Sequence, residues 1–175
     1  MAENISIETL SGATIRELIA PLSALFSRII ADGASMSFLA PLLPETADAY
    51  WQKIADDVDA GERVVLVAYV DGVVAGTVQL ALSTPANGTH RTELQKLMVH
   101  PDFQRRGLGA KLMRAAESAA KTHDRRLIVL DTQQGSVAET FYETLGYQRA
   151  GVIPNFAIDN NGALVATVLF YRDLG

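Results

Sequence analysis

The chain has 175 residues, 49% of them hydrophobic and 20% charged, with a formal net charge of −5. This length and composition predict one globular domain, residues 1–175, and exclude a mostly disordered chain. The acidic balance argues against general nucleic-acid binding, which usually requires a basic excess, and the absence of cysteine excludes disulfides and thiolate chemistry.

No apolar run reaches the roughly 18 residues that a bilayer-spanning helix needs. The first residues also lack the basic and apolar regions of a secretory signal. We therefore expect no membrane partner and a cytoplasmic location. The Asp, Glu and His residues show no spacing typical of a metal site, so no metal is expected.

The first half of the chain predicts a strand, two helices and a two-stranded hairpin: residues 4–10, 14–31, 45–60, and the pair 63–70 and 73–82. Apolar residues recur at helical spacing in the first helix, where Pro21 predicts a break or kink. Gly61 ends the second helix. Asp71-Gly72, between the two β-rich runs, is a strong hairpin signal.

The second half predicts a strand, a helix, a strand, a helix and two further strands: residues 92–99, 108–122, 126–132, 135–145, 147–153 and 166–172. The nearly all-apolar run 126–132 is typical of a central strand covered on both faces. Together, the elements predict an α/β fold with a central mixed β-sheet and helices on both faces.

Residues 104–110, Gln-Arg-Arg-Gly-Leu-Gly-Ala, join a predicted strand to a predicted helix. Gly107 and Gly109 allow backbone amides to approach a ligand closely, because no Cβ is in the way. The unpaired N–H groups and the positive dipole end of the helix lie there too, and Arg105 and Arg106 add charge. The loop therefore predicts a phosphate or pyrophosphate site. A dinucleotide or P-loop site is the rival, but the third Rossmann glycine and Gly-Lys-Ser/Thr are missing.

This loop, preceded by Leu-Met-Val-His-Pro, resembles the acetyl-CoA-binding motif of the GNAT N-acetyltransferases. Residues 138–147, Ala-Glu-Thr-Phe-Tyr-Glu-Thr-Leu-Gly-Tyr, resemble a later helix of the same family. The resemblance extends from Gly33 to Gly175 and is closest to the tabtoxin-resistance type. It implies the GNAT acyl-CoA N-acyltransferase fold and an acetyltransferase that uses acetyl-CoA as co-substrate.

The resemblance implies cofactor contacts along the strand before the glycine loop, on the loop itself and at the start of the later helix. These residues are Leu97, Met98, Val99, Gln104, Arg105, Arg106, Gly107, Leu108, Gly109, Ala110 and Ser136. The strands 92–99 and 126–132 are expected to splay and open a cleft for the pantetheine arm. The family commonly has Asn where this chain has Gly135, and Ser136 or Gln134 is the candidate to replace that contact.

Acetyl transfer to an amine requires a neutral amine and protonation of the departing thiolate. Tyr142, whose family counterpart lies near the cofactor sulfur, is the candidate general acid, because a phenol with a pKa of about 10 stays protonated at neutral pH. The alternative is a structural Tyr142 that packs against Phe141. Asp131 ends an apolar strand, where an acid is costly unless it faces a cleft or is paired. We therefore expect Asp131 to be the base, with Glu93 as the second candidate.

In the family, the early helical region covers the acceptor site, so the resemblance makes Ser35, Phe38 and Trp51 candidate substrate neighbours. The alternative interpretation is that Ser35 only fills a loop and that Phe38 and Trp51 are core aromatics. GNAT enzymes are often dimers, so the resemblance also allows a homodimer.

Three functions stay open at this stage. One is an N-acetyltransferase for the primary amine of a small molecule, such as an amino-acid-like toxin or antibiotic, with a role in antibiotic resistance. Another is an acetyltransferase for a protein N-terminus or lysine. The third is a non-catalytic CoA-binding sensor, against which the presence of both Tyr142 and Asp131 argues.

Overall fold

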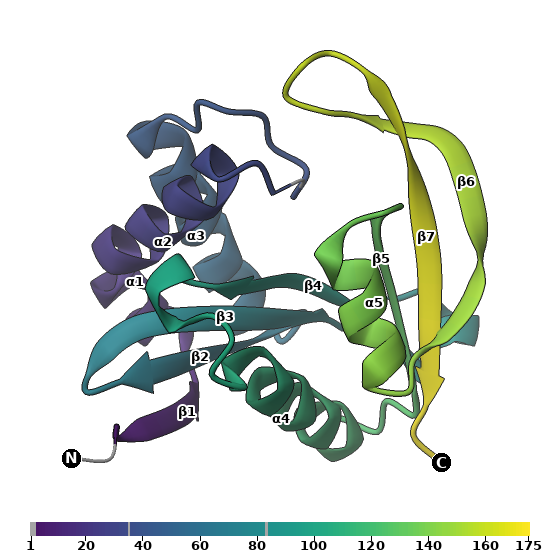
Figure 1. Ribbon diagram of the computed structural model, residues 1–175. Helices are drawn as coiled ribbons and strands as arrows, with labels where there is room; N and C mark the ends of the chain where they lie inside the picture. The colour runs from purple at the N-terminus through teal and green to yellow at the C-terminus, as the bar shows by residue number, and fades with distance from the viewer. Residues whose placement is uncertain (1–2, 35, 83) are drawn as a thin grey trace.

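The computed structural model describes residues 3–34, 36–82 and 84–175. Its seven-stranded sheet has the order β1-β2-β3-β4-β5-β7-β6 (Figure 1). The strands are β1 (Ile5–Thr9), β2 (Arg63–Val70), β3 (Val73–Ala81), β4 (Arg91–Val99), β5 (Leu127–Gln133), β6 (Gln148–Ile158) and β7 (Leu164–Asp173). The β4–β5 pair is parallel and the other pairs are antiparallel, which confirms the predicted mixed sheet.

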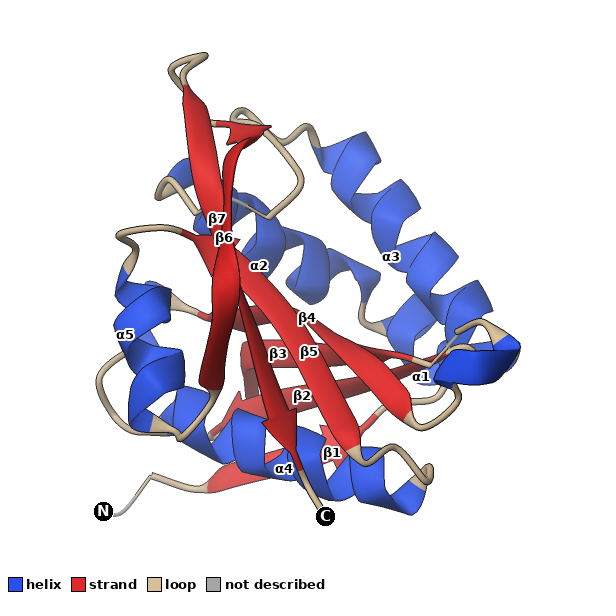
Figure 2. Ribbon diagram, turned by 90° about the vertical axis from the view of Figure 1, so that its right-hand side faces the viewer, coloured by secondary structure: helices blue, strands red, loops and turns tan. Residues whose placement is uncertain are grey.

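Helices lie on both faces of this sheet, as predicted (Figure 2). They are α1 (Gly12–Glu17), α2 (Ile19–Ala31), α3 (Pro44–Asp59), α4 (Leu108–Thr122) and α5 (Val137–Thr144), with short 3-10 helices η1 (Ala86–Gly88) and η2 (Pro101–Phe103). The first three pack on one face, and α4 and α5 pack on the other. No helix in the described ranges is long and apolar enough to cross a membrane.

The first predicted helix is two helices that break at Leu18, three residues before Pro21. Proline lacks an N–H and its ring clashes with the carbonyl four residues earlier, which here belongs to Glu17. Pro21 therefore lies in the first turn of α2, where an N–H has no intrahelical partner to lose.

The strands buried on both faces are β2 and β3 and not, as predicted, the run at 126–132. In β2 the two faces have different partners. Val64 and Leu66 pack with α4 on one face, while Val65 and Val67 pack with the N-terminal helices on the other. In β5, Ile128 and Leu130 are buried, whereas the alternate positions are half-buried and end at the exposed Asp131. The second face of β5 is thus partly open, and a candidate site lies against it.

Strands β4 and β5 pair only where they begin, from Arg91 opposite Leu127 to Glu93 opposite Val129. Beyond that point the register between β4 and β3 shifts, and Lys96 takes a left-handed backbone conformation with φ 51°. Such a bulge bends and twists its strand. The two strands therefore diverge, which confirms the predicted splay.

The last two strands are longer than predicted and form a hairpin that extends beyond the rest of the sheet (Figure 1). The predicted strand 147–153 ends at the residue before Pro154, and proline usually marks an edge or end of a strand. Here β6 is an edge strand, and it continues past Pro154 through an irregularity at which Asn155 has φ 55°. The carboxylate of Asp159 then accepts hydrogen bonds from the N–H groups of Asn161 and Ala163 and fixes the turn.

Gly76 offers a test of the close contact between β3 and β4. A Cβ at this position would lie 2.6 Å from the carbonyl oxygen of Met98, so Gly76→Ala must push the two strands apart. We expect a loss of about 2 kcal/mol in the free energy of unfolding, measured by urea titration. Gly151→Ala in β6, where a Cβ meets nothing within 4 Å, is the matched control and should be nearly neutral. Equal stability of both variants would contradict this account.

Candidate functional site

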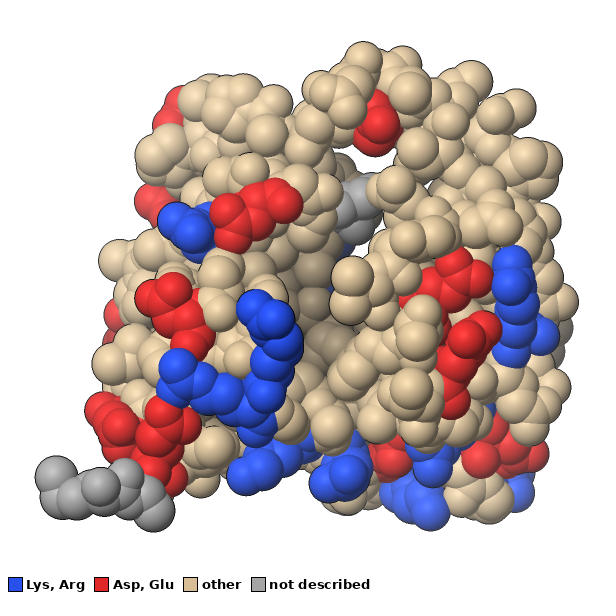
Figure 3. Space-filling model, in the orientation of Figure 1, with Lys and Arg blue, Asp and Glu red and all other residues tan. Residues whose placement is uncertain are grey.

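A cavity of about 710 Å³ opens where β4 and β5 diverge. Its wall comes from the loop after α2, from β4, from the end of β5, from α5 and from the β6–β7 hairpin. Figure 3 shows the surface hollowed between the half that contains β1–β4 and the half that contains β5–β7. A volume of this size is typical of small-molecule sites.

Tyr142 lines this cavity from α5 and is otherwise packed in the core, with 7% of its surface exposed. Its ring lies 5.6 Å from that of Phe141 and 6.0 Å from that of Phe170, centroid to centroid. Burial raises the pKa of its phenol well above the usual value, and the nearby charge of Asp131 raises it further. No described residue forms a hydrogen bond with its hydroxyl, which is therefore free to act on a ligand.

A variant of the capping box, in which the glutamate binds the N–H before the N-cap residue, fixes the start of the helix that carries Tyr142. The Ser136 hydroxyl accepts a hydrogen bond from the Glu139 N–H, and the Glu139 carboxylate accepts one from the Gly135 N–H at 2.6 Å. The Ser136 hydroxyl also lies 3.2 Å from that of Thr132. Ser136, a predicted cofactor residue, thus has a structural role as the cap of α5.

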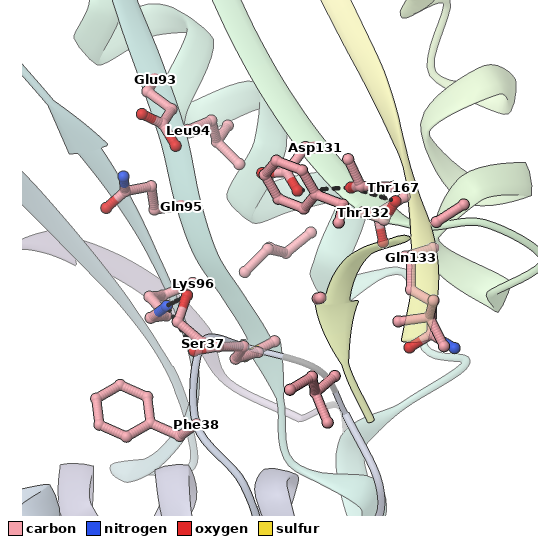
Figure 4. Close-up of a pocket in the computed structure, with 18 of the residues that line it drawn as sticks. Ser37, Phe38, Glu93, Leu94, Gln95, Lys96, Asp131, Thr132, Gln133 and Thr167 are labelled. Carbon is pink, nitrogen blue, oxygen red and sulfur yellow. Dashed lines mark hydrogen bonds between the residues drawn. The ribbon is translucent and has the colours of Figure 1, made fainter. Parts of the chain in front are cut away.

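Asp131 and Glu93 bring two carboxylates to the cavity from facing strands (Figure 4). Both side chains are exposed. The hydroxyl of Thr167, on β7, donates to Asp131 Oδ2 at 2.7 Å and also lies 2.9 Å from the carbonyl oxygen of Thr132. Because Thr167 is itself 3% exposed, it holds the Asp131 carboxylate in a fixed orientation. Glu93 is the last residue of β4 that pairs with β5.

Lys96 is a cavity residue that the sequence interpretation missed. Its Nζ donates to the carbonyl oxygen of Met36 at 2.7 Å and to the Ser37 hydroxyl at 3.3 Å, and lies 5.8 Å from the centre of the Phe38 ring. Burial, and to a smaller extent the charge of Arg63, lower the pKa of Lys96 to about 8 against the opposing charges of Asp131 and Glu93. A lysine inside the otherwise apolar and amide-bearing run Leu-Gln-Lys-Leu-Met was the signal available in the sequence.

The glycine loop leaves the start of α4 open. Gly107 has φ 78° and provides no side-chain cap, and among the described residues no backbone acceptor outside the helix binds the N–H groups of Leu108, Gly109 or Ala110. A Cβ on Gly109 would lie 3.3 Å from the Phe141 ring, so this glycine is also required for packing against α5. An open helix N-terminus with free N–H groups fits a phosphate.

Three side chains beside these N–H groups have the following positions. Gln104 Nε2 donates to the Val99 carbonyl oxygen at 3.0 Å. Arg106 forms an ion pair with Glu3 and lies over the Phe103 ring at 5.6 Å. Arg105 is exposed and has φ 58°. Arg105 is thus the arginine of the two with no carboxylate partner among the described residues.

The strand residues predicted to contact the cofactor, Leu97, Met98 and Val99, lie beyond the last β4–β5 pair, so their strand edge toward β5 is free of pairing. The Leu97 side chain lines the cavity, whereas that of Met98 is buried in the core. A free strand edge next to the open start of α4 can hold an extended ligand by backbone hydrogen bonds.

The three predicted substrate neighbours differ in position. Phe38 lines the cavity and packs edge-to-face on Phe26, with centroids 5.1 Å apart. Trp51 is fully buried against Phe26 and Tyr50 and is not part of the lining, which corrects the expectation that it lies beside the acceptor. The Trp51 side chain faces the core because the sheet covers that side of α3. Ser35 lies outside the described residues.

The shifted pKa of Lys96 predicts a pH-dependent stability. The folded-state pKa of about 8 lies below the ordinary value of 10.5, so between these values the unfolded chain binds more protons. The free energy of unfolding should therefore rise with pH above about pH 8. In Lys96→Met this rise, measured by urea unfolding at about pH 7.5 and about pH 9.5, should be smaller.

Lys121→Met, at the exposed end of α4, is the control for that measurement and should keep the pH dependence of the natural chain. An equal rise in the Lys96 variant and the natural chain would contradict a lowered pKa for Lys96.

The chain is similar in sequence to known acetyltransferases. Residues 30–147 match the sequence profile of the Acetyltransferase (GNAT) family. A curated relative from Azospirillum brasilense, an uncharacterized N-acetyltransferase in the hisH-hisA intergenic region, is 29% identical over 104 residues. That match covers 58% of this chain and 60% of the relative, so the chain spans somewhat less than two thirds of the curated protein's length.

Solved structures share the fold. An N-acetyltransferase from Staphylococcus aureus Mu50 superposes with a TM-score of 0.81 at 15% identity, covering 98% of this chain and 99% of that one. The protein yncA from Salmonella typhimurium, whose structure contains its cofactor acetyl-CoA, gives a TM-score of 0.78 at 18% identity, covering 98% and 95%. With the family profile matched over more than half of its length, the chain belongs to the acetyltransferase (GNAT) family.

Proposed function

We propose that this acetyltransferase moves the acetyl group of acetyl-CoA to the primary amine of a small molecule, in the class of amino-acid-like toxins and antibiotics. The observation that carries the proposal is one cavity, at the divergence of β4 and β5, that is lined by Tyr142, Asp131 and Glu93. An acid and two carboxylates around one small-molecule cavity are the groups that acetyl transfer to an amine requires.

Acetyl-CoA, when bound, supplies the acetyl group as a thioester. The N–H groups of Leu108, Gly109 and Ala110 would hold its pyrophosphate, with Arg105 adding a positive charge. Arg106 could do the same only by releasing Glu3. The free edge of β4 from Leu97 to Val99 would hold the pantetheine arm in the cleft. Ser136 or Gln134 would replace the contact that Asn makes with the pantetheine arm in the family.

Tyr142 would act as the acid. Its raised pKa keeps the proton on the phenol oxygen throughout the neutral range, so the hydroxyl is available to protonate the departing sulfur. The packing of the ring against Phe141 and Phe170 serves the same end, because it holds the hydroxyl at one place on the cavity wall. The structural and catalytic interpretations of Tyr142 are therefore compatible.

Asp131 would take the proton from the acceptor amine. The Thr167 hydroxyl donates a hydrogen bond to one carboxylate oxygen of Asp131, Oδ2. The other oxygen is free to bind the ammonium or accept its proton. Glu93 has no hydrogen-bond partner among the described side chains, and we assign it the looser role of attracting the ammonium. The exposure of both carboxylates allows a proton to pass on to solvent.

The shape of the cavity favours a small acceptor over a protein substrate. The loop that carries Phe38 and the β6–β7 hairpin with Phe156 and Ile158 both contribute to its wall. An extended peptide would need a groove that is open at both ends.

Acetylation of a protein N-terminus or lysine is the second candidate function, and a CoA sensor without catalysis is the third. We further expect a cytoplasmic location, and a homodimer remains an expectation from the family.

The direct test is an amine panel with acetyl-CoA, in which thiol release is measured. The panel should contain amino acids, amino-acid-like antibiotics and simple amines, with N-terminal and lysine peptides as the competing class. We expect turnover with small amines and not with peptides. Turnover with peptides alone would favour the protein acetyltransferase, and CoA binding without any turnover would favour the sensor.

Tyr142→Phe separates the chemistry of the hydroxyl from the packing of the ring. We expect turnover to fall about a hundredfold with little change in acetyl-CoA affinity, because one acid–base group contributes on that order. Steady-state kinetics and calorimetry measure the two effects. Tyr171→Phe, which removes a hydroxyl bonded to Gln148 outside the cavity, is the matched control. Near-normal turnover in Tyr142→Phe would leave the residue with a structural role only.

Asp131→Asn keeps the size of the side chain and its contact with Thr167 but removes the base. We expect turnover to fall strongly and the residual rate to rise with pH, since solvent hydroxide then removes the amine proton. Glu93→Gln should be milder and mainly raise KM for the acceptor. Rate profiles from about pH 6 to about pH 10 at saturating acetyl-CoA compare the two. The reverse ranking of the two variants would exchange their roles.

A further inference from the structure

Lys96 places a positive charge in the cavity where the acceptor of the proposed reaction, itself an ammonium, would bind. Among the described residues that line the cavity, it is the only one with a cationic side chain. Its backbone is held in the left-handed region at the β4 bulge, a conformation that costs free energy in a residue other than glycine. The bulge thus places this side chain where a regular strand would not.

The ammonium of Lys96 has no countercharge within ion-pair distance. Its hydrogen bonds go to two neutral oxygens, the Met36 carbonyl and the Ser37 hydroxyl. Among the described residues, no carboxylate oxygen lies within 4.0 Å of its Nζ. A partly buried charge without a partner is costly, and a lowered pKa is the consequence. An anion that bound there would remove this cost.

The residue before Lys96 adds a hydrogen-bond donor on the same strand of the cavity wall. Gln95 also lines the cavity, and its Oε1 accepts a hydrogen bond from Arg63 Nη1 at 2.9 Å. With the oxygen occupied, the amide nitrogen of Gln95 is the group left to donate. Arg63 also donates to Gln79 at 3.0 Å, and its charge is paired with Asp57 at 3.4 Å. This part of β4 therefore offers the Gln95 amide as a donor and Lys96 as the unpaired positive charge.

The Asp131 carboxylate lies elsewhere on the wall, whereas Glu93 is on β4 beside Gln95. Figure 4 shows Lys96 beside Ser37 on the side of the loop, and Asp131 beside Thr167 on β5 and β7. A simple alkyl amine, which is an ammonium at neutral pH, would be attracted by Asp131 and repelled by Lys96. A molecule with both an ammonium and a carboxylate would find an opposite charge for each group.

We infer that Lys96 and Gln95 form a subsite for a carboxylate of the acceptor, so that the acceptor is an amine that also carries a carboxylate. The inference rests on the proposed function, because it concerns the acceptor of that reaction. It makes Lys96 a specificity-determining residue: the lysine selects which amines are acetylated and takes no part in the proton transfers.

A structural role for Lys96 is the competing explanation. Its hydrogen bond to Met36 could serve only to hold the loop over the cavity. In that case its loss would weaken every acceptor equally. A carboxylate subsite instead predicts that the loss matters for acceptors with a carboxylate and not for matched acceptors without one, so pairs of acceptors separate the two roles.

The experiment compares free L-amino acids with their carboxamides, in which a neutral amide replaces the carboxylate. Because this change also lowers the pKa of the neighbouring amine, each kcat/KM is expressed per unprotonated acceptor. For the natural chain we expect kcat/KM to be about tenfold to a hundredfold higher for the acids, the range for a charged hydrogen bond. Lys96→Met should abolish the difference and Lys96→Arg should keep part of it. Lys121→Met, on the exposed end of α4, should leave it unchanged.

Binding provides a readout that does not depend on turnover. N-acetyl-amino acids and N-acetyl-amino acid amides, the products of those pairs, are titrated calorimetrically into the protein with saturating CoA. We expect tighter binding of the acids, lost in Lys96→Met. Binding without preference for the carboxylate, no binding of either product, or an equal loss for acids and amides in Lys96→Met, overturns the inference.

The two proposals fail in different ways. Acetylation of small amines with no advantage for the acids refutes the subsite alone. Carboxylate-dependent product binding without turnover on any amine supports the subsite and refutes the proposed reaction.

Discussion

The site depends on the separation of two parallel strands that begin as neighbours. Strands β4 and β5 are hydrogen-bonded from Arg91 to Glu93 on the β4 side and then diverge, because a bulge at Lys96 bends β4 away. The unpaired backbone would be costly in a buried sheet. Here it borders a cavity, so the groups lost to the sheet become groups available to a ligand. The same divergence aligns the free strand edge with the open start of α4, and in this way one distortion creates the cleft and its polar lining.

The two layers of helices contribute different groups to this cleft. On one face, α4 and α5 contribute the open N-terminus and Tyr142, and their spacing depends on Gly109, which leaves room for the Phe141 ring. On the other face, α2 and α3 pack on the sheet through Phe26 and Trp51 and carry the loop that reaches Lys96. The proposed cofactor end of the site and the proposed acceptor end are therefore supported by separate parts of the core.

Much of this could be predicted from local sequence. The helices and strands have clear periodicity. The glycine loop and the Tyr142 helix are short contiguous motifs, and the resemblance to the GNAT family rests on them. Trp51 and Lys96 could not be assigned in this way. Whether an aromatic side chain of α3 faces the core or the cavity depends on how the helix is rotated on the sheet. The bulge that directs Lys96 into the cavity depends on pairing with β3, which no local pattern in β4 indicates. The length of β6 could not be assigned locally either, since a proline such as Pro154 stops a central strand but not an edge strand.

The β6–β7 hairpin forms part of the cavity wall although its outer portion lies beyond the main body of the sheet (Figure 1). Phe156, Ile158 and Leu164 line the cavity, and each is more than half exposed. Because these side chains add little to the core, natural variation at the three positions can change the shape of the proposed acceptor end at small cost in folding free energy. Selection for a new acceptor could therefore act on the hairpin while the glycine loop and Tyr142 stay unchanged, which makes this ribbon the adaptable part of an otherwise constrained enzyme.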